Sequence, residues 1–489
     1  MKRPGLSVPS EETKRVLILG GGFGGIYAAL RLEKWLARRA DLGVTLVTRE
    51  NYFLFTPILP EVAAGELELS TIINPLRRLL KRVKSFVGII GAIDLKARRV
   101  TVAHAVDGHT HELYYDQLIL ALGAGTNFFN LSGVEDSCLT LKTLGDAVTI
   151  RNQLITHLEE ANSECAAGER QPLLTFIVAG GGFAAVETLG GINDFVREAI
   201  RFYPNLRPDY LRFILVTPDE VILPELNWKL GIYAQRKITM RGVEIVTGAR
   251  VSAFRDGIVE LTNGEKIPAN TLIWTAGTAP NPLIAALPLP KRNGRIVVND
   301  YLGIDGWPGV WAVGDCALVS NPRAGGFYPP TAQHALREGS AVARNVAATL
   351  YGGRIKPFRY STFGQLAAIG RHAGVANILG LNFSGFFAWW LWRTIYLSKL
   401  PRIEKKIRVA LDWTLDLCFP RDFACVTTPR RAHHAGESPN LFVPQPKARL
   451  GSYVEPSTLV APLLRRVAVR ANTQTWASAT PTQRRRGID

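Results

Sequence analysis

The chain has 489 residues, about two to three times the usual length of one domain, so we expect more than one hydrophobic core. Hydrophobic residues make up 47% of the sequence and charged residues 20%, which excludes disorder over most of the length. The formal net charge is +17, and many of the positive charges lie in roughly the last hundred residues. This placement favours a basic, peripheral appendage, and no nucleic-acid-binding motif accompanies it.

The cysteines and the first residues exclude several classes of protein. Five cysteines are an odd number, and their spacing matches neither C-x-x-C nor a metal site, so we expect no disulfide framework, no metal and a reducing compartment. Residues 1–15 form a polar leader without the apolar segment of a secretory signal.

One segment of the sequence occurs twice, at residues 16–25 and 175–185, with Gly180 standing 160 residues after Gly20. Each copy is a short apolar run, then glycines, then a segment with helical spacing. A second strand-like run follows each copy, at residues 43–48 and 211–217. The sequence therefore predicts two βαβ units, each with a parallel sheet and a right-handed crossover.

The glycines of each copy follow the G-x-G-x-x-G or G-x-G-x-x-A pattern of dinucleotide-binding turns. The first glycine permits the tight bend, the second lets the backbone approach a pyrophosphate, and the third small residue lets helix pack on strand. The positions are Gly20, Gly22 and Gly25 in the first copy, and Gly180, Gly182 and Ala185 in the second. Two matches in the strand-to-helix context predict two dinucleotide sites.

The ribose-binding acid departs from this pattern. The second strands end in Thr48 and Thr217 instead of Asp or Glu, and Glu50 and Asp219 follow two residues later. Either acid reaches a ribose or the carboxylate is absent, so the choice between NADH and NADPH stays open. Hairpin turns at residues 107–108 and 263–264 predict a β-meander in each unit.

Further segments of the chain resemble the two-dinucleotide-domain flavoprotein reductases and, within them, the type II NADH:quinone oxidoreductases. The resemblance extends from about residue 14 to about residue 423. The segments that carry it are residues 51–57, 120–129, 222–226, 274–277, 310–315 and 331–335.

This resemblance implies an α/β protein with two Rossmann-like domains, which hold FAD and NADH. Hydride passes from NADH to FAD, and two electrons then reach a quinone without proton pumping. The implied catalytic residues are Glu187 and Gln333. The implied cofactor-binding positions, besides the glycine turns and Glu50, are Pro57, Ile90, Ala121, Gly123, Ala276, Gly277, Gly314, Asp315, Ala332 and Gln333.

Several of these positions have plainer explanations. Asp315 is otherwise a helix N-cap, and Glu187 is otherwise a first-turn Glu that complements the helix dipole. His334 is more simply a packed core histidine than a proton donor, and Arg337 stands where the family often has Gln.

Two other functions stay open at this point. A sulfide:quinone oxidoreductase needs cysteines at the flavin, for which only Cys138 and Cys316 are candidates, and free cysteines are usually small buried hydrophobes. An NADH-binding redox sensor is the third hypothesis.

The carboxy-terminal region indicates where the electrons go. Residues 383–392 are the most apolar stretch, but they fall short of the ~20 residues that a spanning helix needs. Apolar residues then recur at helical spacing beside basic ones, which favours a helix that lies on a membrane surface. They are Ile403, Ile407, Ala410, Leu411 and Leu415, flanked by Lys405, Lys406 and Arg408. A helix packed on the core or on a second subunit is the alternative, and a homodimer is compatible with both.

These observations predict a domain order. We expect a leader (1–15), a discontinuous FAD-binding domain (16–150 and 285–382), an NAD(P)H-binding domain (151–284), a membrane-anchoring region (383–426) and a basic, disordered tail (427–489). The expected partners are a quinone and a lipid surface, with the protein peripheral on the cytoplasmic face of the inner (plasma) membrane.

Overall fold

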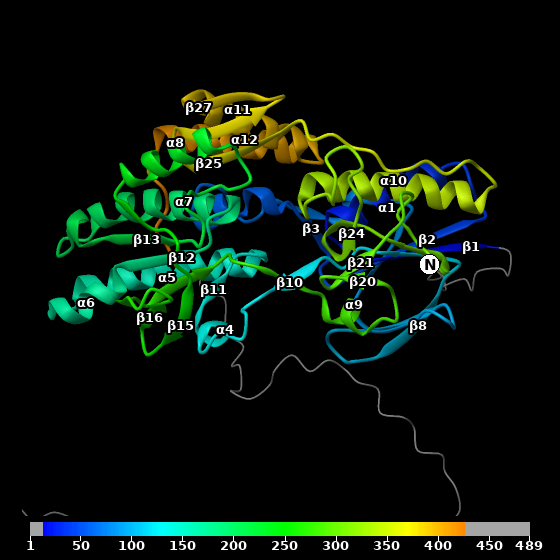
Figure 1. Cartoon of the computed structure of the whole chain (residues 1–489), viewed down its shortest axis with the longest axis horizontal. Helices are drawn as coiled ribbons and strands as arrows, with labels where there is room; N and C mark the ends of the chain where they lie inside the picture. Colours follow the sequence, from blue (N-terminus) through cyan, green and yellow to red (C-terminus); the bar gives the residue numbers. More distant parts are fainter. Residues whose placement is uncertain (1–12, 426–489) are drawn as a thin grey trace, which may run out of the picture. The chain divides into compact units, whose positions relative to one another are not determined.

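The computed structural model describes residues 13–425, and its first sheet contains the first glycine turn (Figure 1). All neighbouring strands in it are parallel except the edge pair β22–β23. The order is β22 (Gly303–Ile304), β23 (Trp307–Ala312), β9 (Gln117–Leu120), β1 (Lys14–Leu19), β2 (Leu42–Thr48) and β5 (Lys84–Val87). Helices α1 (Phe23–Leu36) and α10 (Ala332–Leu350) pack together closely, because a Cβ at Gly339 would lie 2.2 Å from the Gly24 carbonyl oxygen.

The second sheet contains the second glycine turn and is parallel throughout. Its order is β11 (Leu139–Thr140), β18 (Thr271–Trp274), β12 (Thr175–Ala179), β13 (Arg212–Val216) and β14 (Val243–Val246). The residues of β12 and β18 are buried on both faces, as expected for a parallel sheet between layers of helices. The helices of this unit are α5 (Leu144–Ser163), α6 (Ala167–Leu173), α7 (Phe183–Ala199) and α8 (Trp228–Thr239). The expectation of two Rossmann-like α/β units is confirmed.

The two units are joined by short crossing segments. Strand β10 (Ala124–Thr126) pairs antiparallel with β19 (Thr278–Pro280), and Figure 1 shows β10 between the two units. The second sheet takes its first strand, β11, from residues before the expected boundary at 150/151, and α5 spans that boundary.

Each unit also carries a three-stranded meander. In the first, β6 (Ile89–Asp94), β7 (Arg99–Ala103) and β8 (Thr110–Tyr114) pair in sequence, and in the second β15 (Val251–Arg255), β16 (Ile258–Leu261) and β17 (Lys266–Pro268) do so. Gly108 and Gly264 have positive φ in the expected hairpin turns. The shorter elements are β3 (Tyr52–Leu54), η1 (Thr56–Ile58), α2 (Leu59–Ala63), β4 (Ile73–Pro75), α3 (Leu76–Leu79), α4 (Val134–Ser137), η2 (Ile200–Phe202), η3 (Pro208–Tyr210), α9 (Pro282–Ala286), β20 (Lys291–Arg292), β21 (Arg295–Val297), η4 (Gly314–Cys316) and β24 (Ala317–Leu318).

The last described segment is a small sheet followed by two helices. Strands β25 (Gly364–Gly370), β26 (Ala373–Ile378) and β27 (Leu381–Gly385) precede α11 (Phe386–Lys399) and α12 (Ile403–Cys418). A Cβ at Gly190 of α7 would lie 2.5 Å from the Ile369 carbonyl oxygen, so β25 contacts the second unit closely. The expected boundary at 382/383 falls inside β27, and the expected tail lies outside the described residues.

Buried ion pairs attach this segment to the first unit. Arg421 Nη2 lies 3.0 Å from Glu66 Oε1, and its Nε lies 3.1 Å from Asp416 Oδ1. Arg393 of α11 lies 3.2 Å from the other Glu66 oxygen and 3.9 Å from Glu61. All five side chains are less than a tenth exposed, and burial beside Glu66 raises the pKa of Glu61 to about 8. The two arginines therefore hold the carboxy-terminal helices to the residues in and after α2.

Within residues 13–425, every helix is too short or too polar to cross a membrane.

Replacing Arg421 with Met would leave the Glu66 and Asp416 carboxylates buried without this cation. We expect the free energy of unfolding to fall by ~3–5 kcal/mol, seen as a lower urea midpoint in tryptophan fluorescence. Arg201 is exposed, so Arg201→Met should change it by less than about 0.5 kcal/mol. Equal midpoints for the Arg421 variant and the wild type would contradict a stabilising role for this network.

Candidate active site

The first glycine turn has the geometry of a pyrophosphate site. Gly20 has a φ of +113°, and a Cβ there would lie 2.1 Å from the Ala121 carbonyl oxygen. A Cβ at Gly25 would lie 1.9 Å from the Gly20 carbonyl oxygen, so only glycine allows α1 to start here. The space above Gly22, the N-cap of α1, is open within 4 Å. The helix N-terminus therefore presents N–H groups to a space that an anion fits.

The second glycine turn repeats this geometry with one difference. Gly180 has a φ of +126°, and a Cβ there would lie 2.6 Å from Thr275 Oγ1. Ala185 is buried in α7, where the third small residue is expected. At Gly182, however, a Cβ would lie 2.9 Å from Glu225 Oε1. Burial raises the pKa of Glu225, a residue to which the sequence analysis assigned no role.

Both strand-end threonines support the glycine turns. A Cβ at Gly21 would lie 2.2 Å from Thr48 Oγ1, and one at Gly181 would lie 2.3 Å from Thr217 Oγ1. Both threonines are buried, whereas Glu50 and Asp219, two residues further on, are exposed. The positions where a ribose-binding acid is usual are thus occupied by hydroxyl side chains that pack on the turn.

Asp315 lies in η4 at the end of β23, and it is not an N-cap, since Val313 has that position. Burial raises the pKa of its carboxyl, while Arg295 and Lys142 oppose this rise. The preceding Gly314 has a φ of +73°, and its N–H donates to Glu338 Oε2 at 2.7 Å. Glu338 was not predicted from the sequence, and burial raises its pKa to about 7.

The two segments that connect the units, before β10 and before β19, contain small residues predicted to bind the cofactors. Ala121 and Gly123 directly precede β10, and the space around Gly123, which has a φ of +66°, is open within 4 Å. Ala276 and Gly277 precede β19, and Gly277 has a φ of +77°. Ile90 pairs with Val102 in the first meander and packs against the first core.

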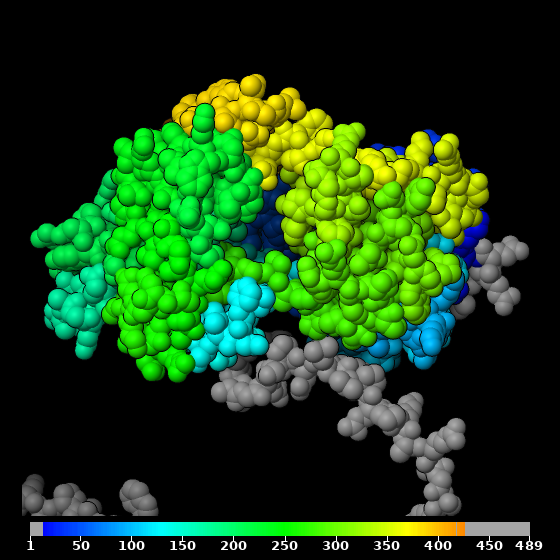
Figure 2. All heavy atoms as spheres, viewed as in Figure 1, coloured from blue at the N-terminus to red at the C-terminus, as the bar shows by residue number. Residues whose placement is uncertain are grey.

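A cavity of about 530 Å³ lies where both units and the carboxy-terminal segment meet. We call it the active-site cavity. Figure 2 shows a hollow between the green surface of the second unit and the yellow-green surface of the first. Four of the sequence-predicted site residues line the cavity, namely Pro57, Glu187, Ala332 and Gln333.

Glu187 reaches from α7 to the carboxy-terminal segment. Its Oε1 accepts hydrogen bonds from Trp392 Nε1 at 2.7 Å and from the Ala368 N–H at 3.2 Å. It lies beyond the first turn of α7, so the helix-dipole explanation does not apply. Burial raises the pKa of Glu187 to about 8 despite these hydrogen bonds. The carboxyl is therefore mostly protonated at neutral pH.

Gln333 lies in the first turn of α10, where its Oε1 accepts a hydrogen bond from Tyr360 Oη at 3.3 Å. The Arg337 guanidinium lies 4.2 Å from the centre of the Tyr360 ring, at the cavity wall. His334 is buried, with Nδ1 2.7 Å from Thr331 Oγ1, and burial lowers its pKa to about 4. It is thus a neutral, packed histidine at pH 7.

Helix α11 supplies a part of the cavity wall that was not predicted from the sequence. The Tyr396 ring centre lies 4.7 Å from that of Trp392 and 6.4 Å from that of Phe55. Lys399 also lines the cavity, and burial lowers its pKa. Trp392, Tyr396 and Lys399 lie at the end of, or just after, residues 383–392, the most apolar stretch of the sequence.

The two candidate thiols do not form a pair. Cys316 lies in the larger hydrophobic cluster, and Cys138 packs against a separate, smaller one that includes Val134 and Trp274. Burial raises the pKa of Cys138 to about 12 and that of Cys316 to about 11. Both are therefore protonated at neutral pH and poor nucleophiles.

Known proteins are similar to this chain over most of its length. The family description "Pyridine nucleotide-disulphide oxidoreductase" matches residues 14–339, and "NDH2 C-terminal domain" matches residues 363–422. A probable NADH dehydrogenase of Dictyostelium discoideum is 31% identical over 421 residues, covering 84% of this chain and 91% of the relative. The type II NADH:quinone oxidoreductase Ndh of Mycobacterium tuberculosis is 32% identical over 434 residues, covering 86% and 91%.

A solved structure has the same fold. NDH2 from Plasmodium falciparum in complex with NADH superimposes with a TM-score of 0.78 at 21% identity, covering 84% of this chain and 100% of that one. The resemblance inferred from the sequence motifs is thereby confirmed. The chain belongs to the pyridine nucleotide-disulphide oxidoreductases and, within them, to the type II NADH:quinone oxidoreductases.

Proposed function

We propose that this chain oxidises NADH and reduces a membrane quinone, with FAD bound in the first unit and NADH in the second. The observation that carries the proposal is the active-site cavity, into which both units and α11 contribute side chains. A cavity shared by the two units allows a nicotinamide and a flavin to meet. The domain division expected from the sequence is part of this proposal, except that β11 and α5 belong to the second unit.

The first unit fits FAD. The open spaces at Gly22 and Gly123 suit a pyrophosphate and backbone contacts. The buried Asp315 would accept hydrogen bonds from the ribityl hydroxyls. When bound, the flavin accepts hydride and passes electrons onward. The proposed binding residues are Gly20, Gly22, Gly25, Glu50, Pro57, Ile90, Ala121, Gly123, Gly314, Asp315, Ala332 and Gln333 in this unit, and Gly180, Gly182, Ala185, Ala276 and Gly277 for NADH.

The protein supplies a proton and an orienting group at the cavity. Glu187 Oε1 accepts two hydrogen bonds, which leaves Oε2 to hold the proton that a reduced quinone takes up. Gln333 Oε1 accepts from Tyr360, so its amide N–H groups are left to donate to a quinone carbonyl. Glu187 and Gln333 are the proposed catalytic residues.

The alternative reactions are less favoured. A sulfide:quinone reaction needs thiolates at the flavin, but Cys138 and Cys316 belong to different hydrophobic clusters and burial raises both pKa values. A redox sensor is less favoured because the similar proteins are a probable NADH dehydrogenase and a type II NADH:quinone oxidoreductase.

We propose that the protein lies on the cytoplasmic face of the inner membrane through α11 and α12. Phe386, Phe387 and Trp390 of α11 are largely exposed. On α12 and at the residue that follows it, apolar side chains at four-residue intervals are all more than half exposed. This stripe consists of Ile403, Ile407, Leu411, Leu415 and Phe419. Such a face suits insertion into the headgroup layer.

The main test is an anaerobic titration of the detergent-purified flavoprotein. We expect stoichiometric NADH to bleach the flavin absorbance and a short-chain quinone to restore it with quinol formation. Bleaching without recovery would favour a sensor. Bleaching by sulfide but not by NADH, abolished in Cys138→Ser or Cys316→Ser, would favour the sulfide reaction.

Replacing Glu187 with Gln keeps an oxygen that accepts the same hydrogen bonds but removes the proton. In stopped-flow experiments, we expect quinone to reoxidise the reduced wild-type protein more slowly as pH rises through about 8, where Glu187 ionises. The Gln variant should be slower below pH 8, by roughly 10²-fold if Glu187 is the acid, and should show no such inflection. An unchanged inflection in the variant would rule out Glu187 as its source.

The membrane proposal is tested by Ile407→Gln/Leu411→Gln. Removing two exposed apolar side chains should weaken cosedimentation with phospholipid vesicles on the order of tenfold. Val106→Gln, at an exposed hairpin turn, is the matched control. Unchanged vesicle binding with loss of a dimer would instead assign the stripe to a subunit interface.

A further inference from the structure

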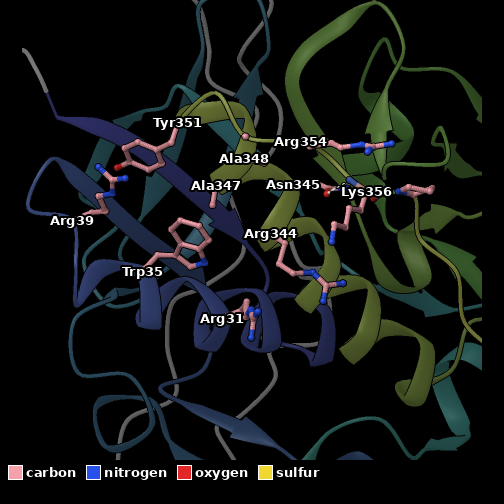
Figure 3. A pocket seen from close by; sticks show the side chains of 12 residues that line it. Arg31, Trp35, Arg39, Arg344, Asn345, Ala347, Ala348, Tyr351, Arg354 and Lys356 are labelled. Carbon is pink, nitrogen blue, oxygen red and sulfur yellow. Dashed lines mark hydrogen bonds between the residues drawn. The ribbon is translucent and has the colours of Figure 1, made fainter.

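A second cavity lies between α1 and α10, near their carboxy-terminal ends (Figure 3). We call it the α1–α10 pocket. Its volume is about 540 Å³, within the range of small-molecule sites. None of its lining residues also lines the active-site cavity, so it is a separate site.

The pocket is strongly positive. Five of its lining residues are basic and none is acidic, namely Arg31, Arg39, Arg344, Arg354 and Lys356. Arg39 forms a cation–π contact, since its guanidinium lies 4.4 Å from the centre of the Tyr351 ring. The other four form no ion pair within residues 13–425. Two helix C-termini carry about one negative charge together, so four unpaired cations exceed what the helix dipoles require.

The pocket also offers an aromatic surface. In the view of Figure 3, the Trp35 indole lies between the Tyr351–Arg39 pair and the cations Arg31 and Arg344. The Lys356 ammonium points toward Arg344, and Arg354 extends away from Trp35. A flat indole beside several cations suits a ligand with an aromatic ring and phosphate groups.

The wall of the pocket is held in place without a ligand. Asn345 Nδ2 donates to the carbonyl oxygens of Tyr301 and Lys356, each at 2.9 Å, and its Oδ1 accepts the Lys356 N–H at 3.0 Å. The Gly353 N–H donates to the Ala348 carbonyl oxygen at 2.7 Å. These bonds fasten the segment after α10 back onto the helix, so binding does not have to order it.

A phospholipid fits the pocket less well than a soluble nucleotide. An anionic headgroup would satisfy the arginines, but its acyl chains need exposed apolar surface beside the pocket. Among the described residues, the large exposed apolar side chains include none from 13–41 or 340–357. The exposed apolar stripe lies on α12 instead.

We propose that the α1–α10 pocket binds a nucleotide, with its base against Trp35 and its phosphates on Arg31, Arg344 and Lys356. The site is distinct from both glycine turns. It does not depend on the quinone reaction, because neither its residues nor its chemistry enter the active-site cavity.

The test is isothermal titration calorimetry of the holoprotein with ADP at low salt. The wild type should show two classes of site, one at the NADH-binding turn and one in the pocket. Arg31→Glu/Arg344→Glu should weaken one class at least tenfold and leave the other unchanged. Trp35→Leu should weaken ADP binding in the pocket about fivefold but leave binding of inorganic pyrophosphate there unchanged, because only the base stacks on the indole.

The control is Arg201→Glu/Arg255→Glu, which makes the same charge change at exposed positions outside the pocket. Arg344→Glu alone, at an exposed helix position, serves if the double variant loses flavin or secondary structure. Identical ADP isotherms for the wild type and the pocket variant would overturn the proposal. So would an equal loss in the control, or a pocket variant that loses only binding to phosphatidylglycerol vesicles.

Discussion

Two buried arginines, Arg393 and Arg421, hold the carboxy-terminal helices against the first dinucleotide unit. Each contributes its charge to Glu66 and its neighbours, in a region where water is nearly absent. Removing charges from water costs several kcal/mol per ion, which only good geometry with opposite charges offsets. The network therefore favours one position of α11 and α12 over others, because a shifted helix would leave a buried charge unpaired.

The active-site cavity depends on that position. α11 brings Trp392 onto Glu187 and Tyr396 onto the wall, and both contacts exist only if the helix is docked. Burial raises the pKa of the Glu187 carboxyl to about 8, and the hydrogen bond from Trp392 opposes this rise. The docked helix α11 thus supplies one of the groups that act on the protonation of a residue in α7.

The two dinucleotide units use one design with different details. In both, a buried threonine packs on the middle glycine and the first glycine meets the neighbouring crossing segment. The space at Gly22 is open, whereas Glu225 approaches Gly182. The first unit also has α10, which packs on α1 and forms the α1–α10 pocket. α1 starts at the proposed FAD site and extends roughly 20 Å toward this pocket.

Features that depend on neighbouring residues were predictable from the sequence. The glycine turns, the strands before them and the helices after them follow from local steric limits and apolar periodicity, so both units were predicted with their hairpins. The tertiary structure decided the contacts between distant positions. The hydrogen-bonded residues Glu187 and Trp392 are 205 positions apart in the sequence. Gly314 and Glu338, which are also hydrogen-bonded, are 24 positions apart. The most apolar stretch, residues 383–392, was placed in the membrane-anchoring region, yet Trp392 is buried, because composition does not say which face a helix turns inward. The positive charge was visible in the sequence, but only the packing of α10 on α1 brings Arg31 and Arg344 to one pocket.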